Sequence, residues 1–118
     1  MKRYKWRKHI PIFDLCLYLV EDASPRTGYL RLPKSFQSCD QPGKNETATA
    51  LSDGNGKFAI LIGNHCTEGF IAHEVSHVVD FMMSYLEARP KKDGEIVGLL
   101  SHYITDWIYA KLIFSKRK

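Results

Sequence analysis

The segment GFIAHEVSHVVDFM, residues 69–82, decides how the rest of the chain is interpreted. It places His73 and His77 four residues apart, with Glu74 directly after the first histidine. Successive residues of an α-helix are about 100° apart, so this spacing brings the two imidazoles to within about 40° of each other. Both rings can then reach one zinc ion at its usual distance of roughly 2.0–2.1 Å.

Glu74 is better placed to act on water than to bind metal. It lies about 60° past His77 around the helix. From there its carboxylate can hold a metal-activated water and take its proton, which is the role of a general base. The alternative is an ordinary helix with two histidines on its polar face, because H-E-x-x-H also arises by chance.

The rest of this helix is amphipathic. We expect it to begin after Thr67 as N-cap and to run to about Glu87, before Pro90. Asp80 shares the histidine side with Phe70 and Phe81, and its carboxylate could accept the second ring proton of a zinc-bound histidine. A plain surface position is the other interpretation of Asp80. The opposite side is the expected core face, with Ile71, Val75, Val78, Val79, Met82 and Leu86.

A second helix is expected from Gly94 to about Phe114, returning along the first, with Asp93 as its N-cap. Glu95 lies in its first turn, 18 residues after His77. A catalytic zinc usually has three protein ligands and one open position, so Glu95 is the candidate third ligand. Its alternative role is to complement the helix dipole near the N-terminus.

His102 lies nearly on the same face of this second helix as Glu95, seven residues further along. It is a candidate for the catalytic set, either as an alternative metal ligand or as a donor to a developing oxyanion. It could equally be a partly buried histidine with a structural role.

Strand patterns fill the N-terminal half. We expect one strand over residues 11–22, a short one over 29–33, and a hairpin whose strands are 47–51 and 57–63. The turn SDGNG between the last two supplies Gly54 and Gly56, which tolerate positive φ. Strands followed by two long helices predict the α+β class in a single domain over residues 1–118.

The composition is that of an ordinary globular domain. The formal net charge is +4, and the basic ends, about residues 1–8 and 115–118, are expected to be solvated tails. No basic-aromatic pattern argues for nucleic acid, which is an unlikely partner. Three cysteines at irregular spacing suggest no disulfide framework and are easiest to reconcile with a reducing cytoplasm. The apolar run after the basic start is interrupted by Pro11 and Asp14, so neither a signal peptide nor a membrane span is expected.

The segment HEVSH with the downstream EIVGLLSHYI resembles the small gluzincin metallopeptidases. The layout of hairpin, active-site helix and returning helix is similar to compact zincin-like proteins common in bacteriophage genomes, including the anti-repressor metallopeptidase type. The likeness covers about residues 57–108. It implies a zinc-dependent metallopeptidase acting on a protein or peptide in the bacterial host cytoplasm, with His73, His77 and Glu95 as zinc ligands and Glu74 as base.

The resemblance also implies how a substrate binds. In that fold the strand before the active-site helix lines the cleft, and an extended substrate pairs with its edge. Residues 57–63 stand in that place, so Phe58, Ile60 and Ile62 are the implied substrate-binding residues of an edge strand.

Two other functions stay open. The chain could be a non-catalytic phage protein that keeps the zincin scaffold to bind and inhibit a host factor. A metal amidase or deformylase is less favoured, because no G-C-L-S-like segment accompanies Cys66. The substrate, the physiological metal and the oligomeric state are not indicated by the sequence.

Overall fold

The computed structural model of the chain describes residues 4–10, 14–64, 66–86 and 94–117, with the backbone alone for residues 4, 94–97 and 112–117. Its four-stranded sheet contains β1 (Tyr4–Ile10), β2 (Leu15–Glu21), β3 (Ala48–Ser52) and β4 (Lys57–Ile62) in the order β1-β2-β4-β3. The central strands β2 and β4 are parallel, and the two outer pairs are antiparallel.

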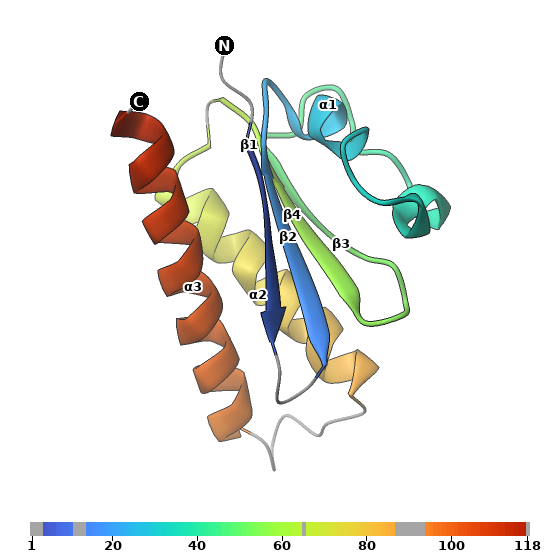
Figure 1. Ribbon diagram of the computed structural model, residues 1–118, viewed down its shortest axis with the longest axis vertical. Helices are drawn as coiled ribbons and strands as arrows, with labels where there is room; N and C mark the ends of the chain where they lie inside the picture. The colour runs from blue at the N-terminus through green and yellow to red at the C-terminus, as the bar shows by residue number, and fades with distance from the viewer. Residues whose placement is uncertain (1–3, 11–13, 65, 87–93, 118) are drawn as a thin grey trace.

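Two long helices, α2 (Glu68–Tyr85) and α3 (Gly94–Arg117), cover one face of the sheet (Figure 1). Helix α2 contacts β3, β4 and α3, and α3 lies beside β1, so α2 is flanked by β3 on one side and α3 on the other. The short helix α1 (Pro25–Tyr29) and the 3₁₀ helix η1 (Lys34–Ser38) lie on the opposite face. This arrangement is the α+β domain expected from the order of the elements.

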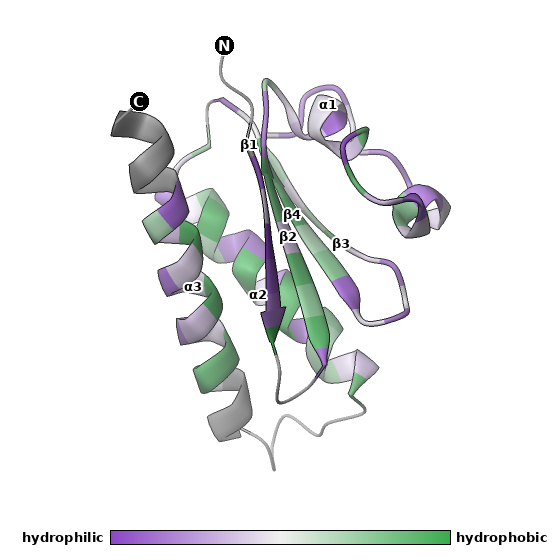
Figure 2. Cartoon of the chain, viewed as in Figure 1, coloured by the Kyte–Doolittle hydropathy of each residue, from purple (hydrophilic) through white to green (hydrophobic). Residues whose placement is uncertain are grey.

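Hydrophobic residues form the main core between the sheet and the two long helices. Figure 2 shows β2 and β4 as mostly hydrophobic ribbons, whereas β1 is largely hydrophilic. Because the central strands are covered on both faces, their side chains are buried in either direction. The main core includes Leu15, Leu17, Leu19, Phe58, Ile60, Ile71, Val75, Val78, Met82, Leu100, Ile104 and Ile108.

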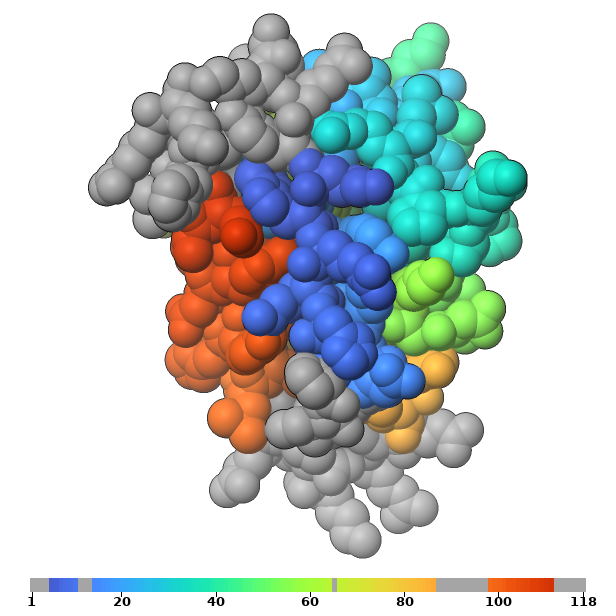
Figure 3. All heavy atoms as spheres, viewed as in Figure 1, coloured from blue at the N-terminus to red at the C-terminus, as the bar shows by residue number. Residues whose placement is uncertain are grey.

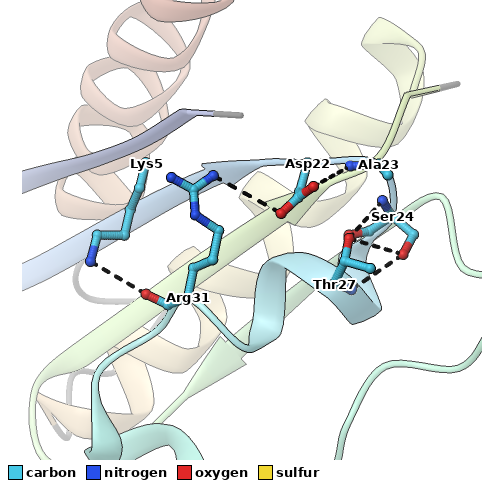
Figure 4. Close-up of polar contacts among 6 residues, drawn as sticks. All are labelled: Lys5, Asp22, Ala23, Ser24, Thr27 and Arg31. Carbon is cyan, nitrogen blue, oxygen red and sulfur yellow. Dashed lines mark hydrogen bonds and ion pairs between the residues drawn. The ribbon is translucent and has the colours of Figure 1, made fainter. Parts of the chain in front are cut away.

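The corner that leads from β2 into α1 is held by polar contacts (Figure 4). Ser24 caps α1 in a reciprocal capping box with Thr27. The buried Asp22 carboxylate accepts a 2.7 Å hydrogen bond from the Ala23 N–H, and its other oxygen lies 4.0 Å from Arg31 Nη1. The segment after β2 therefore packs back over the sheet as the short helix α1.

Several sequence expectations agree with these elements. The hairpin of β3 and β4 is confirmed, with Gly54 at φ 80° and Gly56 at φ 88° in its turn. The N-cap of α2 is confirmed, since the Thr67 side chain accepts a hydrogen bond from the Phe70 N–H. The helix ends at Tyr85 with Leu86 as C-cap, close to the end expected at about Glu87, and the expected N-cap Asp93 of the next helix lies outside the described residues.

Other expectations were wrong in their boundaries. The strand expected over 11–22 begins at Leu15, and residues 4–8, expected as a tail, belong to β1. Pairing with β2 orders this basic stretch, which sequence composition alone favoured as solvated. Residues 29–33 form no strand, because Tyr29 ends α1. At the other end, α3 continues to Arg117, into the stretch expected as a second tail.

The strand over residues 57–63 is not the edge of the sheet. β4 pairs with β2 on one side and β3 on the other, so Phe58, Ile60 and Ile62 are buried core residues. Their implied role as edge-strand substrate contacts is therefore wrong, and the free edge beside α2 belongs to β3. Among the described residues, no helix combines the length and apolar character needed to cross a membrane.

Candidate metal-binding site on helix α2

The rotation of α2 about its axis is fixed by its buried residues. Ile71, Val75 and Val78 pack into the main core, which turns the side of the helix that carries His73 and His77 toward solvent. Burial of aliphatic side chains, rather than any polar contact, thus orients the histidines. The acidic Glu68 in the first turn adds a favourable interaction with the helix dipole.

The two histidine rings converge. His73 Nε2 and His77 Nε2 lie 2.9 Å apart, and the ring centroids are separated by 4.5 Å with an interplanar angle of 88°. An ion at roughly 2.0–2.1 Å from both nitrogens would be bound at an angle of about 90°, which zinc accepts with modest distortion from a tetrahedron. The same separation suits a hydrogen bond between two neutral rings of opposite tautomers. The pair fits two ligand positions of a zinc ion.

Glu74 lies next to this pair and is nearly buried, with 8% of its surface exposed. Desolvation is the main cause that raises the pKa of its carboxyl above the ordinary value, and the charge of Glu46 raises it further. His77, His73 and a hydrogen bond from the Ala50 backbone N–H act in the opposite direction. A carboxylate whose pKa is raised binds a proton more readily near neutral pH, as a general base requires.

A cleft of about 650 Å³ opens beside these side chains. One wall is α2 and the other is the start of β3 with the segment before it. The cleft is thus built between α2 and the β3 edge of the sheet. Its lining residues are Asn45, Glu46, Thr47, Ala48, Thr49 and Ala50 on one wall, and Phe70, His73, Glu74, His77 and Phe81 on the other.

The hydrogen-bonding direction of β3 follows from two bonds at its ends. Asp53 N–H donates to the Lys57 carbonyl, and Gly63 N–H donates to the Thr47 carbonyl. Backbone groups alternate in direction along an antiparallel strand, so Thr49 and Leu51 also point toward β4. Ala48 and Ala50 therefore direct their N–H and C=O groups away from the sheet, which agrees with the Ala50 bond to Glu74.

Two of the remaining predicted site residues, His102 and Asp80, do not lie at the histidine pair. Both are exposed, and neither lines the cleft. Glu95 lies in the first turn of α3, but its side chain is outside the described set, so its role as third ligand stays a prediction. Within the side chains that the structure describes, no three His, Cys, Asp or Glu residues are grouped closely enough to hold a metal ion.

Glu46 is the site residue that sequence reasoning missed. It precedes β3, lines the cleft and is close enough for its charge to act on Glu74. The segment around it, GKNET, carries no motif, so only the folding of β3 against α2 reveals it. Phe70 and Phe81 were expected on the histidine side of the helix, and both line the cleft.

Comparisons of the chain with protein-family models, with curated proteins and with solved structures find no match.

Proposed function

We propose that the protein is a zinc-dependent metallopeptidase, with Glu74 as the general base. The observation that supports this most strongly is the 2.9 Å approach of His73 Nε2 and His77 Nε2 in a cleft that also contains Glu74. Two exposed imidazoles and an adjacent, nearly buried carboxylate beside an edge strand are groups that zinc-dependent peptide hydrolysis uses.

His73 and His77 would hold the zinc, with Glu95 as the third ligand expected from the sequence. When bound, zinc supplies Lewis acidity toward the scissile carbonyl and toward water. The proton transfers are carried out by a side chain of the protein. Glu74 removes the proton from the attacking water and delivers it to the leaving amine, and its low exposure keeps its pKa above that of a solvated carboxyl.

Substrate pairing on β3 is part of the proposal. The outward N–H and C=O groups of Ala48 can pair with an extended peptide, in the manner of strand addition. Small alanine side chains at Ala48 and Ala50 leave room for such a peptide between β3 and α2. This replaces the pairing on residues 57–63 that the resemblance implied.

The test is metal content together with proteolysis. Purified protein dialysed against zinc should contain about one equivalent by elemental analysis and should cleave an unfolded protein such as reduced casein. Glu74→Gln should keep the zinc and lose cleavage, because the amide cannot accept the proton. Unchanged cleavage by Glu74→Gln would exclude Glu74 as the base.

A non-catalytic protein on the same scaffold, which binds and inhibits a host factor, is the second candidate. One observation favours it: the described side chains supply two metal ligands at the cleft and no assembled third. For that function the cleft would bind a peptide segment without cutting it. Stable capture of a host protein by wild-type protein, with every captured chain intact, would distinguish it from a peptidase.

A further inference from the structure

Two aromatic side chains on α2 remain unexplained by packing. Phe70 is 47% exposed and Phe81 is 36% exposed, although both are large and apolar. Exposed aromatic residues that line a cleft are typical of binding surfaces. Both belong to the wall that also carries His73, Glu74 and His77.

The spacing of the two rings is informative. They are 11 positions apart on one helix, which brings them to within about 20° of each other around its axis and about 16 Å apart along it. The centre of the histidine pair falls within one residue of their midpoint. Along the helix axis, the two positions therefore lie about 8 Å from the centre of the histidine pair, one on either side.

These distances match an extended chain. A β-strand rises about 3.3 Å per residue and points successive side chains to opposite faces, so only residues an even number apart can both face α2. The even spacing nearest to 16 Å is four residues, about 13 Å, which places the two side chains two or three residues from the histidine pair. The outward edge of β3 is the opposite wall of the same cleft and can hold a peptide in that conformation. Because the side chains of Ala48 and Ala50 are small, the side chains of a bound peptide would make most of their contacts with α2.

Phe70 also has free space on its other side. With Thr67, Gly69 and His73 it lines a second hollow of about 350 Å³. A bulky substrate side chain can therefore pack on the Phe70 ring without displacing the chain from β3. The opposite end, at Phe81, has the same aromatic surface.

We propose that Phe70 and Phe81 are the specificity-determining residues of the cleft, and that it takes extended peptides with two bulky apolar side chains four residues apart, both facing α2. These side chains lie two or three residues from the bond over the histidine pair, one on each side. The position of that bond rests on the proposed function. The preference for apolar side chains does not depend on it.

The experiment measures binding to the Glu74→Gln protein with zinc present, so that no probe is cut. The probe is a labelled unstructured peptide of about ten residues with two phenylalanines four residues apart, and its binding is followed by fluorescence anisotropy. It should bind about tenfold more tightly than the same peptide with serine at both positions. A peptide with the two phenylalanines adjacent should lose most of this advantage.

Single substitutions then test whether the preference for phenylalanine depends on Phe70 and Phe81. In the Glu74→Gln background, Phe70→Ala and Phe81→Ala should each reduce the affinity for the two-phenylalanine peptide by about fivefold. Leu99→Ala is the matched control, since Leu99 is 70% exposed on α3 and lies outside the cleft. It should bind like the Glu74→Gln parent.

Equal affinity for the phenylalanine and serine peptides overturns the inference, as does full preference in both Phe→Ala variants. The outcome is separable from that of the proposed function. A preference in the Glu74→Gln protein with no cleavage by wild type sustains this inference and refutes the peptidase. Cleavage by wild type, with no preference for the phenylalanine peptide, refutes this inference and sustains the peptidase.

Discussion

The two edges of the sheet, β1 and β3, differ in charge and in what their side chains do. β1 is basic, and its side chains make local contacts: Lys5 Nζ donates to the Arg31 carbonyl, Arg7 Nε to Cys16 Sγ, and Lys8 Nζ lies 5.3 Å from the Tyr103 ring centroid. Figure 3 shows β1 on the near face between α3 and the segment of α1 and η1. β3 has the sequence ATALS and carries no charge.

This difference has a physical meaning. Lysine and arginine on an edge strand oppose pairing with another chain, because an added strand would have to desolvate or displace them. A small, uncharged edge lacks that protection. The uncharged edge is the one beside His73, His77 and Glu74. Its Ala50 N–H bonds the Glu74 carboxylate and its Ser52 carbonyl accepts a hydrogen bond from Cys39 Sγ, so the pairing proposed for a peptide concerns the groups of Ala48.

Removing one histidine should have the largest effect. His77→Ala leaves a single imidazole at the site, and zinc affinity should fall by more than about 100-fold, since even outer-shell partners contribute 10- to 100-fold. Zinc affinity is measured by competition with a chromophoric chelator, and peptidase activity should disappear with it. His102→Ala is the control, because His102 lies outside the cleft. Unaltered zinc binding in His77→Ala would contradict the site.

Closing the β3 edge should have the next largest effect. Ala48→Pro removes an outward N–H while the ladder to β4 stays intact, since that N–H points away from the sheet. Loss of one hydrogen bond should weaken peptide binding to the Glu74→Gln protein by roughly two- to tenfold.

A neighbouring substitution controls for proline itself. Thr49→Pro removes an N–H that points toward β4, and it should lower the melting temperature rather than act only on binding. If Ala48→Pro and Thr49→Pro had the same effect on stability, the assignment of outward and inward groups on β3 would be wrong.

The raised pKa of Glu74 predicts a pH-dependent stability in protein stripped of metal. Because burial raises its pKa in the folded state, ionised Glu74 opposes folding, and its contribution to stability is fully present below the ordinary glutamate pKa. This contribution is lost as pH rises through the folded-state value. Glu74→Gln should therefore be more stable than wild type at neutral pH, and the difference should shrink toward pH 4.

Thermal unfolding of both metal-free proteins across that pH range measures this difference. Asp80→Asn is the matched control, because Asp80 is an exposed carboxyl on the same helix. A constant difference between Glu74→Gln and wild type at all pH values would mean that the charge of Glu74 does not matter to folding.

The smallest effect is expected at β1. His9 Nε2 and Asp14 Oδ1 lie 3.0 Å apart, but both side chains are exposed, so water screens their attraction. His9→Ala should change the free energy of unfolding by less than about 0.5 kcal/mol and leave peptide binding unchanged. Chemical denaturation and anisotropy are the measurements, and weaker peptide binding in His9→Ala would implicate the β1 edge.

Local patterns predicted much of this protein. The spacing of His73 and His77, the cap at Thr67 and the apolar stripe of α2 are properties of neighbouring residues, because helix geometry relates positions three and four apart. The β3–β4 turn followed from Gly54 and Gly56 for the same reason. The convergence of the imidazoles and the α+β class could accordingly be predicted from the sequence.

Only the tertiary structure decided which strand lies beside the histidines. A strand's place in a sheet depends on pairing between distant segments, and nothing within residues 57–63 indicates that β2 occupies their second side. The same long-range pairing turned the basic start of the chain into β1 and brought Glu46 next to Glu74. Sequence thus determined the chemical groups on α2, and packing against the sheet determined which wall they face.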